Sequence, residues 1–145
     1  MPRRSIDTEI WSDPRFLDLP PDGKLTFLRL TTGPDMTPAG AIRSPARRVA
    51  ADTGMSVKRA EAAIEAVVQS GLARRYDDGW VWLPSWLKYQ VSGPSFIASA
   101  RRAAATLPDS LKVAVGRELD RLFGARERRP KADDGPDKGP TRKGP

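Results

Sequence analysis

Basic side chains are concentrated in one short part of the chain, residues 43–59. This segment holds five basic residues and a single acidic one, Asp52, and its excess of four positive charges is more than half of the net charge of +7. Arginine and lysine bind phosphate groups, so the segment predicts contacts with a polyanion, nucleic acid first and an anionic membrane second. A solvated basic surface is the alternative. The five residues are Arg43, Arg47, Arg48, Lys58 and Arg59.

Two short helices are expected in this region, separated by a glycine. Ser44 followed by Pro45 is typical of a helix start, with a hydroxyl cap and then proline at the first helical position. Gly54 is expected to end that helix in the left-handed conformation that glycine adopts cheaply. Ser56 then caps a second helix, residues 56–70. Two helices joined by a tight turn predict a helix–turn–helix, whose first helix crosses the DNA backbone, so the arginines at 43, 47 and 48 suit phosphates.

The second helix is expected to place one face in the core and the other in the major groove of DNA. Its apolar stripe is Val57, Ala60, Ile64, Val67 and Val68. Its outer face carries Ser56, Lys58, Arg59, Ala62 and Ala63. Small alanines would let the helix sit deep in the groove, and Arg59 could donate to a guanine edge while Lys58 meets a phosphate. Glu61 and Glu65 complicate this face; they could accept from a cytosine, but we favour stabilisation of the helix through nearby basic residues.

A β-hairpin is expected directly after the second helix, which is the position of a wing. Asp78-Gly79 is a tight-turn signal, and the strand formers of residues 80–83 follow it. Arg74 and Arg75 lie on the first strand, and one of them is expected to point toward a phosphate or the minor groove. The tip is acidic and is not expected to lie on DNA. Residues 40–43 can supply a third short strand.

Aromatic side chains after the turn raise a rival hypothesis, in which they stack on single-stranded bases. Strand alternation places Trp80 and Trp82 on one face, most simply over the core. We therefore favour duplex DNA as the partner. A helix–turn–helix reused as a protein-interaction domain is the other alternative.

The remaining chain predicts a mainly α protein with a small β wing, a winged helix–turn–helix plus C-terminal helices. A first helix is expected at residues 20–31, with Leu25 and Leu28 facing the core, and Trp11 and Phe16 are expected to close the core. Three regions follow: a winged-helix DNA-binding domain at residues 1–94, a C-terminal helical extension at 95–124 that could form a homodimer interface, and a disordered Pro/Gly-rich charged tail at 125–145.

Composition excludes several functional classes. The chain has no cysteine and no histidine, which excludes disulfides and zinc fingers and removes the commonest general base and the thiol nucleophile. We expect no catalytic activity, no cofactor and no metal. No stretch approaches the length of an apolar membrane span, and the N-terminus lacks the apolar core of a signal peptide. The expected location is the cytoplasm, in association with the nucleoid.

Several blocks of sequence resemble a known family. They are IWSDPRF, LPPDGKLTFLRL, GAIR and GLARRYDDGWVWLPSWLKYQ. In this order they resemble the N-terminal domain of phage replisome-organiser or replication-initiation proteins, and they are similar to the winged helix of DnaD-type primosomal proteins. The resemblance implies binding of origin DNA in a phage, prophage or plasmid, self-association, and recruitment of a helicase or helicase loader. The chain departs from the pattern because only a short helical region and a tail follow the winged helix.

Two other functions stay open at this point. A bare winged helix serves equally well in a transcriptional regulator of a mobile element's own genes, and fold alone does not decide between promoter and origin. A replisome protein-interaction adaptor that hardly touches DNA is the third hypothesis.

Overall fold

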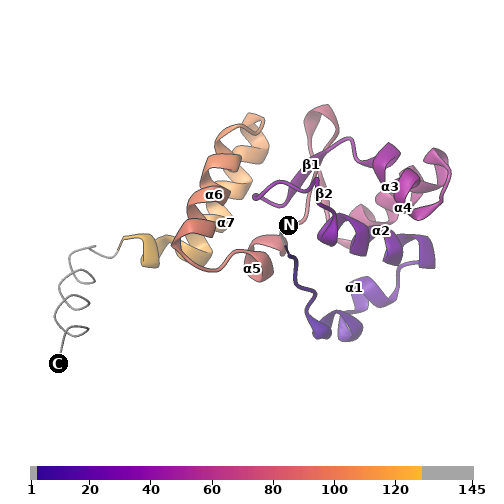
Figure 1. The fold of residues 1–145 in the computed structure, drawn as a ribbon, viewed down its shortest axis with the longest axis horizontal. Helices are drawn as coiled ribbons and strands as arrows, with labels where there is room; N and C mark the ends of the chain where they lie inside the picture. Colours follow the sequence, from indigo (N-terminus) through magenta and orange to yellow (C-terminus); the bar gives the residue numbers. More distant parts are fainter. Residues whose placement is uncertain (1–2, 129–145) are drawn as a thin grey trace, which may run out of the picture.

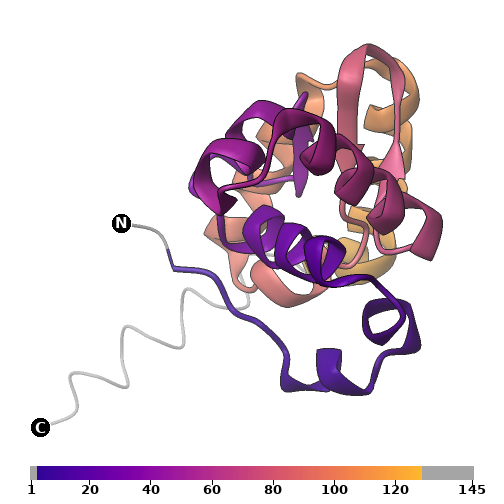
Figure 2. The same cartoon turned by 90° about the vertical axis from the view of Figure 1, so that its right-hand side faces the viewer.

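The computed structural model describes residues 3–128, which form a mainly helical molecule with one small sheet (Figure 1). The N-terminal segment contains two short helical elements and loops past the outside of the first long helix (Figure 2). The elements are η1 (Thr8–Ser12), α1 (Pro14–Leu17), α2 (Pro21–Thr32), β1 (Ala41–Arg43), α3 (Ala46–Thr53), α4 (Val57–Ser70), β2 (Arg74–Arg75), η2 (Asp77–Gly79), β3 (Trp80–Trp82), α5 (Trp86–Gln90), α6 (Pro94–Ala105) and α7 (Asp109–Glu127).

The three strands form an antiparallel sheet in the order β1-β3-β2. β1 arises between α2 and α3, whereas β2 and β3 form the hairpin that follows α4. In this arrangement the last strand lies between the other two, and the hairpin stands beside the helix–turn–helix as a wing (Figure 1). The predicted fold class, a mainly α protein with a small β wing, is confirmed.

Local signals set most helix boundaries as predicted. The hydroxyl of Ser56 accepts a hydrogen bond from the Arg59 N–H at 3.1 Å and so caps α4. Gly54 (φ 81°) and Gly71 (φ 91°) end α3 and α4 in the left-handed conformation.

The prediction that Ser44 caps α3 is wrong. Ser44 has a φ of 46°, and α3 begins at Ala46 with Pro45 as its cap residue. The Ser44 N–H donates instead to the carbonyl of Gly79 at 2.8 Å. This hydrogen bond extends the pairing of β1 with the wing, and the pairing overrides the local helix-start signal.

One continuous hydrophobic core runs from the N-terminal segment to α7, and it covers both faces of the sheet. In Figure 1 the strands lie between α3 and α4 on one side and α6 and α7 on the other. Val81 and Trp82 point to opposite faces of β3, yet both are at least 98% buried. The indole N–H of Trp82 donates to the Ala39 carbonyl at 3.2 Å. Trp80, on the same face as Trp82, packs partly buried against this core.

Four assignments of side chains to the core or to the surface are wrong. Leu25, Trp11 and Val57 are exposed to 46%, 60% and 38%, whereas Ala63, expected on the outer face of α4, is buried. Phe16 is buried as predicted, and Trp11 packs edge-on against it from outside.

The C-terminal helices also differ from the prediction in extent and exposure. α7 continues to Glu127, so residues 125–127 of the predicted tail are helical, and residues 129–145 of that tail lie outside the described part of the chain. Leu111, Val115 and Leu119 of α7 are buried within the chain's own core.

Two glycines with positive φ allow the cost of backbone strain to be compared with the cost of a steric clash. Gly40 (φ 79°) and Gly54 (φ 81°) share a conformation, but a Cβ added at Gly40 would lie 2.7 Å from the Cβ of Trp86, whereas one at Gly54 would contact nothing within 4 Å. We expect Gly54→Ala to cost about 1–2 kcal/mol, the ordinary penalty of the left-handed conformation, and Gly40→Ala to cost clearly more. Urea unfolding followed by circular dichroism measures both. Equal losses would contradict the packing of Gly40 against Trp86.

Candidate nucleic-acid interface

The start of α3, one side of α4 and the wing enclose an open groove of about 490 Å³. Arg47 comes from α3, Val57, Glu61 and Ile64 from α4, and Arg75 from β2. Two basic side chains and one acidic one therefore border a surface whose floor is partly apolar. Of the residues predicted to contact DNA, Ser44, Arg47 and Arg75 line this groove.

The linker from β1 to α3 is fixed to the wing at two points. The Ser44 N–H donates to the Gly79 carbonyl at 2.8 Å, and Arg43 Nε donates to the Asp78 carbonyl at 3.0 Å. Gly79 leaves no room for a side chain, because an added Cβ would overlap the Ser44 hydroxyl. These two hydrogen bonds join the wing to the start of α3.

Three of the predicted DNA-contacting cations are held by carboxylates. Arg48 pairs with Asp35 at 3.3 Å and also donates to the carbonyls of Arg43 and Ser44. The other two pairs, Arg59 with Asp22 and Arg75 with Glu65, each have a closest distance of 2.8 Å. Among residues 3–128, four predicted contact residues have no carboxylate partner: Arg43, Arg47, Lys58 and Arg74.

Arg59 lies on the flank of α4 that faces α2 rather than on the side that borders the wing. Its Nε and Nη2 donate to the two carboxylate oxygens of Asp22 at 3.0 and 2.8 Å. These hydrogen bonds hold the pKa of Asp22 below its ordinary value. Ala62 lies beside this pair and, like Lys58, is exposed. In this structure Arg59 is therefore not free to donate to a base.

The outward face of α4 is less basic than expected. Besides Lys58 it exposes Glu61, Glu65 and Gln69. Glu65 accepts hydrogen bonds from the Gln69 amide at 2.7 Å and from Arg75 at 2.8 Å, and these lower its pKa. Of these two partners only Arg75, on β2, is basic, and the favoured role of Glu65, stabilisation of the helix through nearby basic residues, stays a prediction. Glu61 makes no hydrogen bond or ion pair within the described residues and borders the groove.

The side chains of Arg74 and Arg75 point to opposite faces of the wing. Arg75 is in register with Val81 and pairs with α4. Arg74 is in register with Trp82, and its guanidinium lies 5.8 Å from the centre of that indole ring. Strand alternation therefore places only Arg75 at the groove.

A partly buried ion-pair network joins α2, the loop that follows it, and α3. The side chain of Arg29 in α2 is 12% exposed and pairs with Asp35 at 3.0 Å and Asp52 at 2.8 Å. Arg48 of α3 pairs with Asp35 as well. Burial alone would raise the pKa of Asp35. The hydrogen bonds and charge of Arg29, together with the charge of Arg48, outweigh that effect, so the pKa lies below its ordinary value. Sequence periodicity gave no sign of this network.

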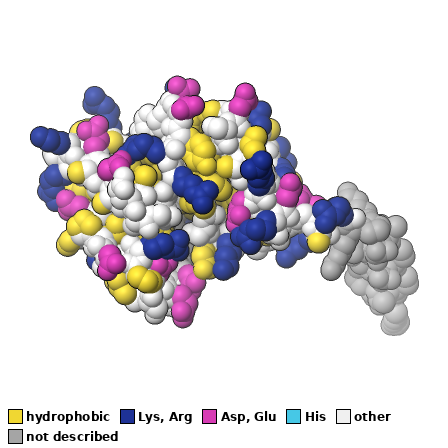
Figure 3. Space-filling model, turned by 180° about the vertical axis from the view of Figure 1, so that it is seen from behind, with side chains coloured by type: hydrophobic (Ala, Val, Ile, Leu, Met, Phe, Trp, Pro, Cys, Tyr) yellow, Lys and Arg dark blue, Asp and Glu magenta, His cyan; other side chains and the backbone are white. Residues whose placement is uncertain are grey.

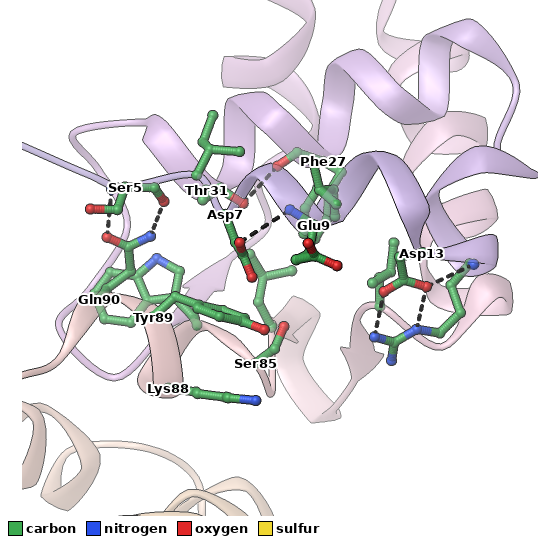
Figure 4. Close-up of a pocket in the computed structure, with 16 residues that line it drawn as sticks. Ser5, Asp7, Glu9, Asp13, Phe27, Thr31, Ser85, Lys88, Tyr89 and Gln90 are labelled. Carbon is green, nitrogen blue, oxygen red and sulfur yellow. Dashed lines mark hydrogen bonds and ion pairs between the residues drawn. The ribbon is translucent and has the colours of Figure 1, made fainter.

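A second hollow, of about 220 Å³, lies between the N-terminal segment and α5 (Figure 4). Ser5 and Gln90 face each other there, and the Ser5 N–H donates to the Gln90 side chain at 2.9 Å. Two of the carboxylates are used locally: Asp7 accepts from the Glu9 N–H, and Asp13 pairs with Arg15. The hydrogen bonds between Ser5 and Gln90 therefore attach the N-terminal segment to α5.

Two further features bear on the type of site. Within residues 3–128, acidic side chains nowhere gather in a group that could hold a metal ion. None of the helices described is both long enough and apolar enough to span a bilayer.

The fold and this groove define a winged-helix class of protein, and the comparisons with known proteins add no family to it. Neither a family model nor a curated protein nor a solved structure matches the chain.

The Arg29–Asp35 pair predicts a specific acid sensitivity. Because the folded-state pKa of Asp35 is lowered, the pair stabilises the fold above the ordinary aspartate value, and this contribution is lost as pH falls below about 4. Asp35→Asn should lower the free energy of unfolding at pH 7 and flatten its pH dependence between about pH 2 and 4. Urea unfolding across that range measures both. Asp77→Asn, on the exposed wing, is the control and should leave the slope unchanged; an unchanged slope in Asp35→Asn would contradict the pairing.

Proposed function

We propose that the protein binds duplex DNA through the groove formed by α3, α4 and the wing. The observation that carries the proposal is the placement of Arg47 of α3 and Arg75 of the wing at one groove, where a hydrogen bond from Ser44 to Gly79 joins the start of α3 to the wing. A major groove admits one helix, and cations on both sides of that helix suit the two phosphate backbones. Arg43 and Lys58, exposed and without carboxylate partners among the described residues, supply further phosphate contacts.

Within this proposal the biological role is initiation of replication in a phage, prophage or plasmid, with the nucleoid as the place of action. That role rests on the resemblance of the four sequence blocks to replisome-organiser and primosomal domains. Regulation of transcription uses the same surface. Self-association and recruitment of a helicase or its loader belong to the same proposal, and exposed Phe96 and Val113 on α6 and α7 are the apolar side chains available there.

A second candidate, the replisome adaptor, is favoured by one observation. Glu61 and Glu65 lie on the outward face of α4, and Arg59 and Arg75 are engaged by carboxylates. A surface of mixed charge suits a protein partner as well as a phosphate backbone. Direct measurement of DNA affinity separates the two candidates.

The phosphate contacts predict a defined salt dependence. Arg47→Gln and Lys58→Gln should each weaken binding to all duplexes about equally and reduce the slope of log affinity against log salt by about 0.9, the value for one lost phosphate contact. Fluorescence anisotropy of a labelled duplex over a salt series measures this. Arg102→Gln, an exposed arginine on α6, is the matched control for loss of one charge. If the Arg47 and Lys58 variants both bind with wild-type affinity, DNA binding at this surface is contradicted.

Base recognition by Arg59 requires that it leave Asp22. Asp22→Asn weakens that pair, so it should raise duplex affinity, whereas Arg59→Ala should relax preference at one base position by about tenfold, the discrimination that a bidentate guanine contact provides. Affinities for a selected site and for its single-base variants measure both effects. If Asp22→Asn leaves affinity unchanged and Arg59→Ala only lowers stability, Arg59 joins α4 to α2 and has no role in recognition.

A further inference from the structure

A third cavity, a cleft of about 260 Å³, lies behind the wing, on the side of the sheet that faces the C-terminal helices. Four exposed basic side chains border it, each from a different element. They are Arg15 from α1, Arg74 from β2, Lys88 from α5 and Arg121 from α7. Figure 3 shows basic side chains gathered over the middle of the rear face, where the winged helix meets the C-terminal helices.

The sheet separates this cleft, the Arg74 cleft, from the groove at α4. Successive residues of a strand point to opposite faces, so Arg75 reaches the groove while Arg74 turns to the rear. The guanidinium of Arg74 lies over the Trp82 ring, which is itself buried. Arg74 lines the cleft, and the left-handed end of α4 at Gly71 forms part of its wall.

The charges that line the Arg74 cleft do not cancel. Its four cations face one carboxylate, Glu118, whereas the groove at α4 has two cations and one carboxylate, Glu61. Arg121 holds Glu118 through two hydrogen bonds, which lower the pKa of Glu118, and the charge of Arg74 adds to that effect. Arg15 is held by Asp13.

Two of the four cations stay without a carboxylate partner within residues 3–128. They are Arg74 and Lys88, and they enter the cleft from separate elements. Like charges brought to one concave surface repel each other, and an anion between them removes that repulsion. Guanidinium and ammonium groups together match the oxygens of a phosphate.

We propose that the Arg74 cleft binds phosphate groups. The phosphates can belong to a nucleic-acid backbone or to a free polyphosphate such as a nucleotide; the chemistry of recognition is the same. In the first case a single protein molecule contacts two separate stretches of nucleic acid, one on each face of its sheet. The site does not depend on DNA binding at α4, because the two surfaces share no residue.

The test is a titration of the isotopically labelled full chain followed by amide NMR, first with sodium pyrophosphate and then with a short duplex, at constant ionic strength. Pyrophosphate should shift amides of residues 71–74, 85–88 and 118–121. The double variant Arg74→Gln/Lys88→Gln should weaken pyrophosphate binding at least tenfold. The matched control, Arg102→Gln/Lys112→Gln, removes two exposed charges outside the cleft and should change it less than twofold.

The duplex arm distinguishes the sources of phosphate. If the ligand is a nucleic-acid backbone, the duplex shifts the cleft amides as well, and the double variant reduces the salt slope by about 1.8, for two lost phosphate contacts. If the ligand is a free polyphosphate, the duplex does not shift the amides of the cleft. The proposal is overturned if neither ligand shifts the cleft amides, or if the double variant binds both as wild type does. Amide shifts at residues 44, 46, 47 and 57–64 report separately on the groove, so the experiment can overturn one site without the other.

Discussion

The burial of β3 on both faces is the constraint on which the rest of the molecule depends. Val81, Trp82 and Leu83 are each at least 98% buried although they alternate in direction. One face packs with the helix–turn–helix and the other with the C-terminal helices, and β1 and β2 pair on either side of the same strand. A strand buried on both faces has little freedom to slip, because a shift of one residue would exchange the two faces.

From this strand the positions of the charged side chains follow. Pairing of β2 with β3 in a fixed register sends Arg75 toward α4 and Arg74 toward α7. The hydrogen bond from Ser44 to Gly79 fixes the start of α3 against the wing, so Arg47 lies at the same groove as Arg75. The sheet therefore distributes basic side chains over two surfaces rather than one.

Much of the fold could be predicted because its signals are local. The cap at Ser56, the left-handed turns at Gly54 and Gly71, and the Asp78-Gly79 turn, where both residues have positive φ, depend on neighbours a few positions away. The predicted cap at Ser44 failed because a longer-range hydrogen bond to the wing is made there instead. The side of α4 was misjudged because alanines carry weak periodicity, so Ala63 is buried while Val57 is exposed.

The candidate site was less accessible to sequence reasoning. The basic segment was evident from composition, but the partners of its arginines come from distant positions, such as Asp22 for Arg59 and Asp35 for Arg48. No periodic pattern joins those pairs. The Arg74 cleft was missed for the same reason, since its cations come from four elements spread between Arg15 and Arg121. Alternation within β2 was the one signal that could have shown that Arg74 and Arg75 diverge.

The most direct measurement is affinity selection of duplex fragments from the source genome or element by the full chain at physiological salt, followed by sequencing. Sequence-specific binding through the groove predicts enrichment of a common site, at repeats in or beside a replication gene for an initiator and at promoters for a regulator. If no fragment is enriched and only weak, salt-sensitive binding remains, sequence-specific recognition is contradicted and the adaptor function takes its place.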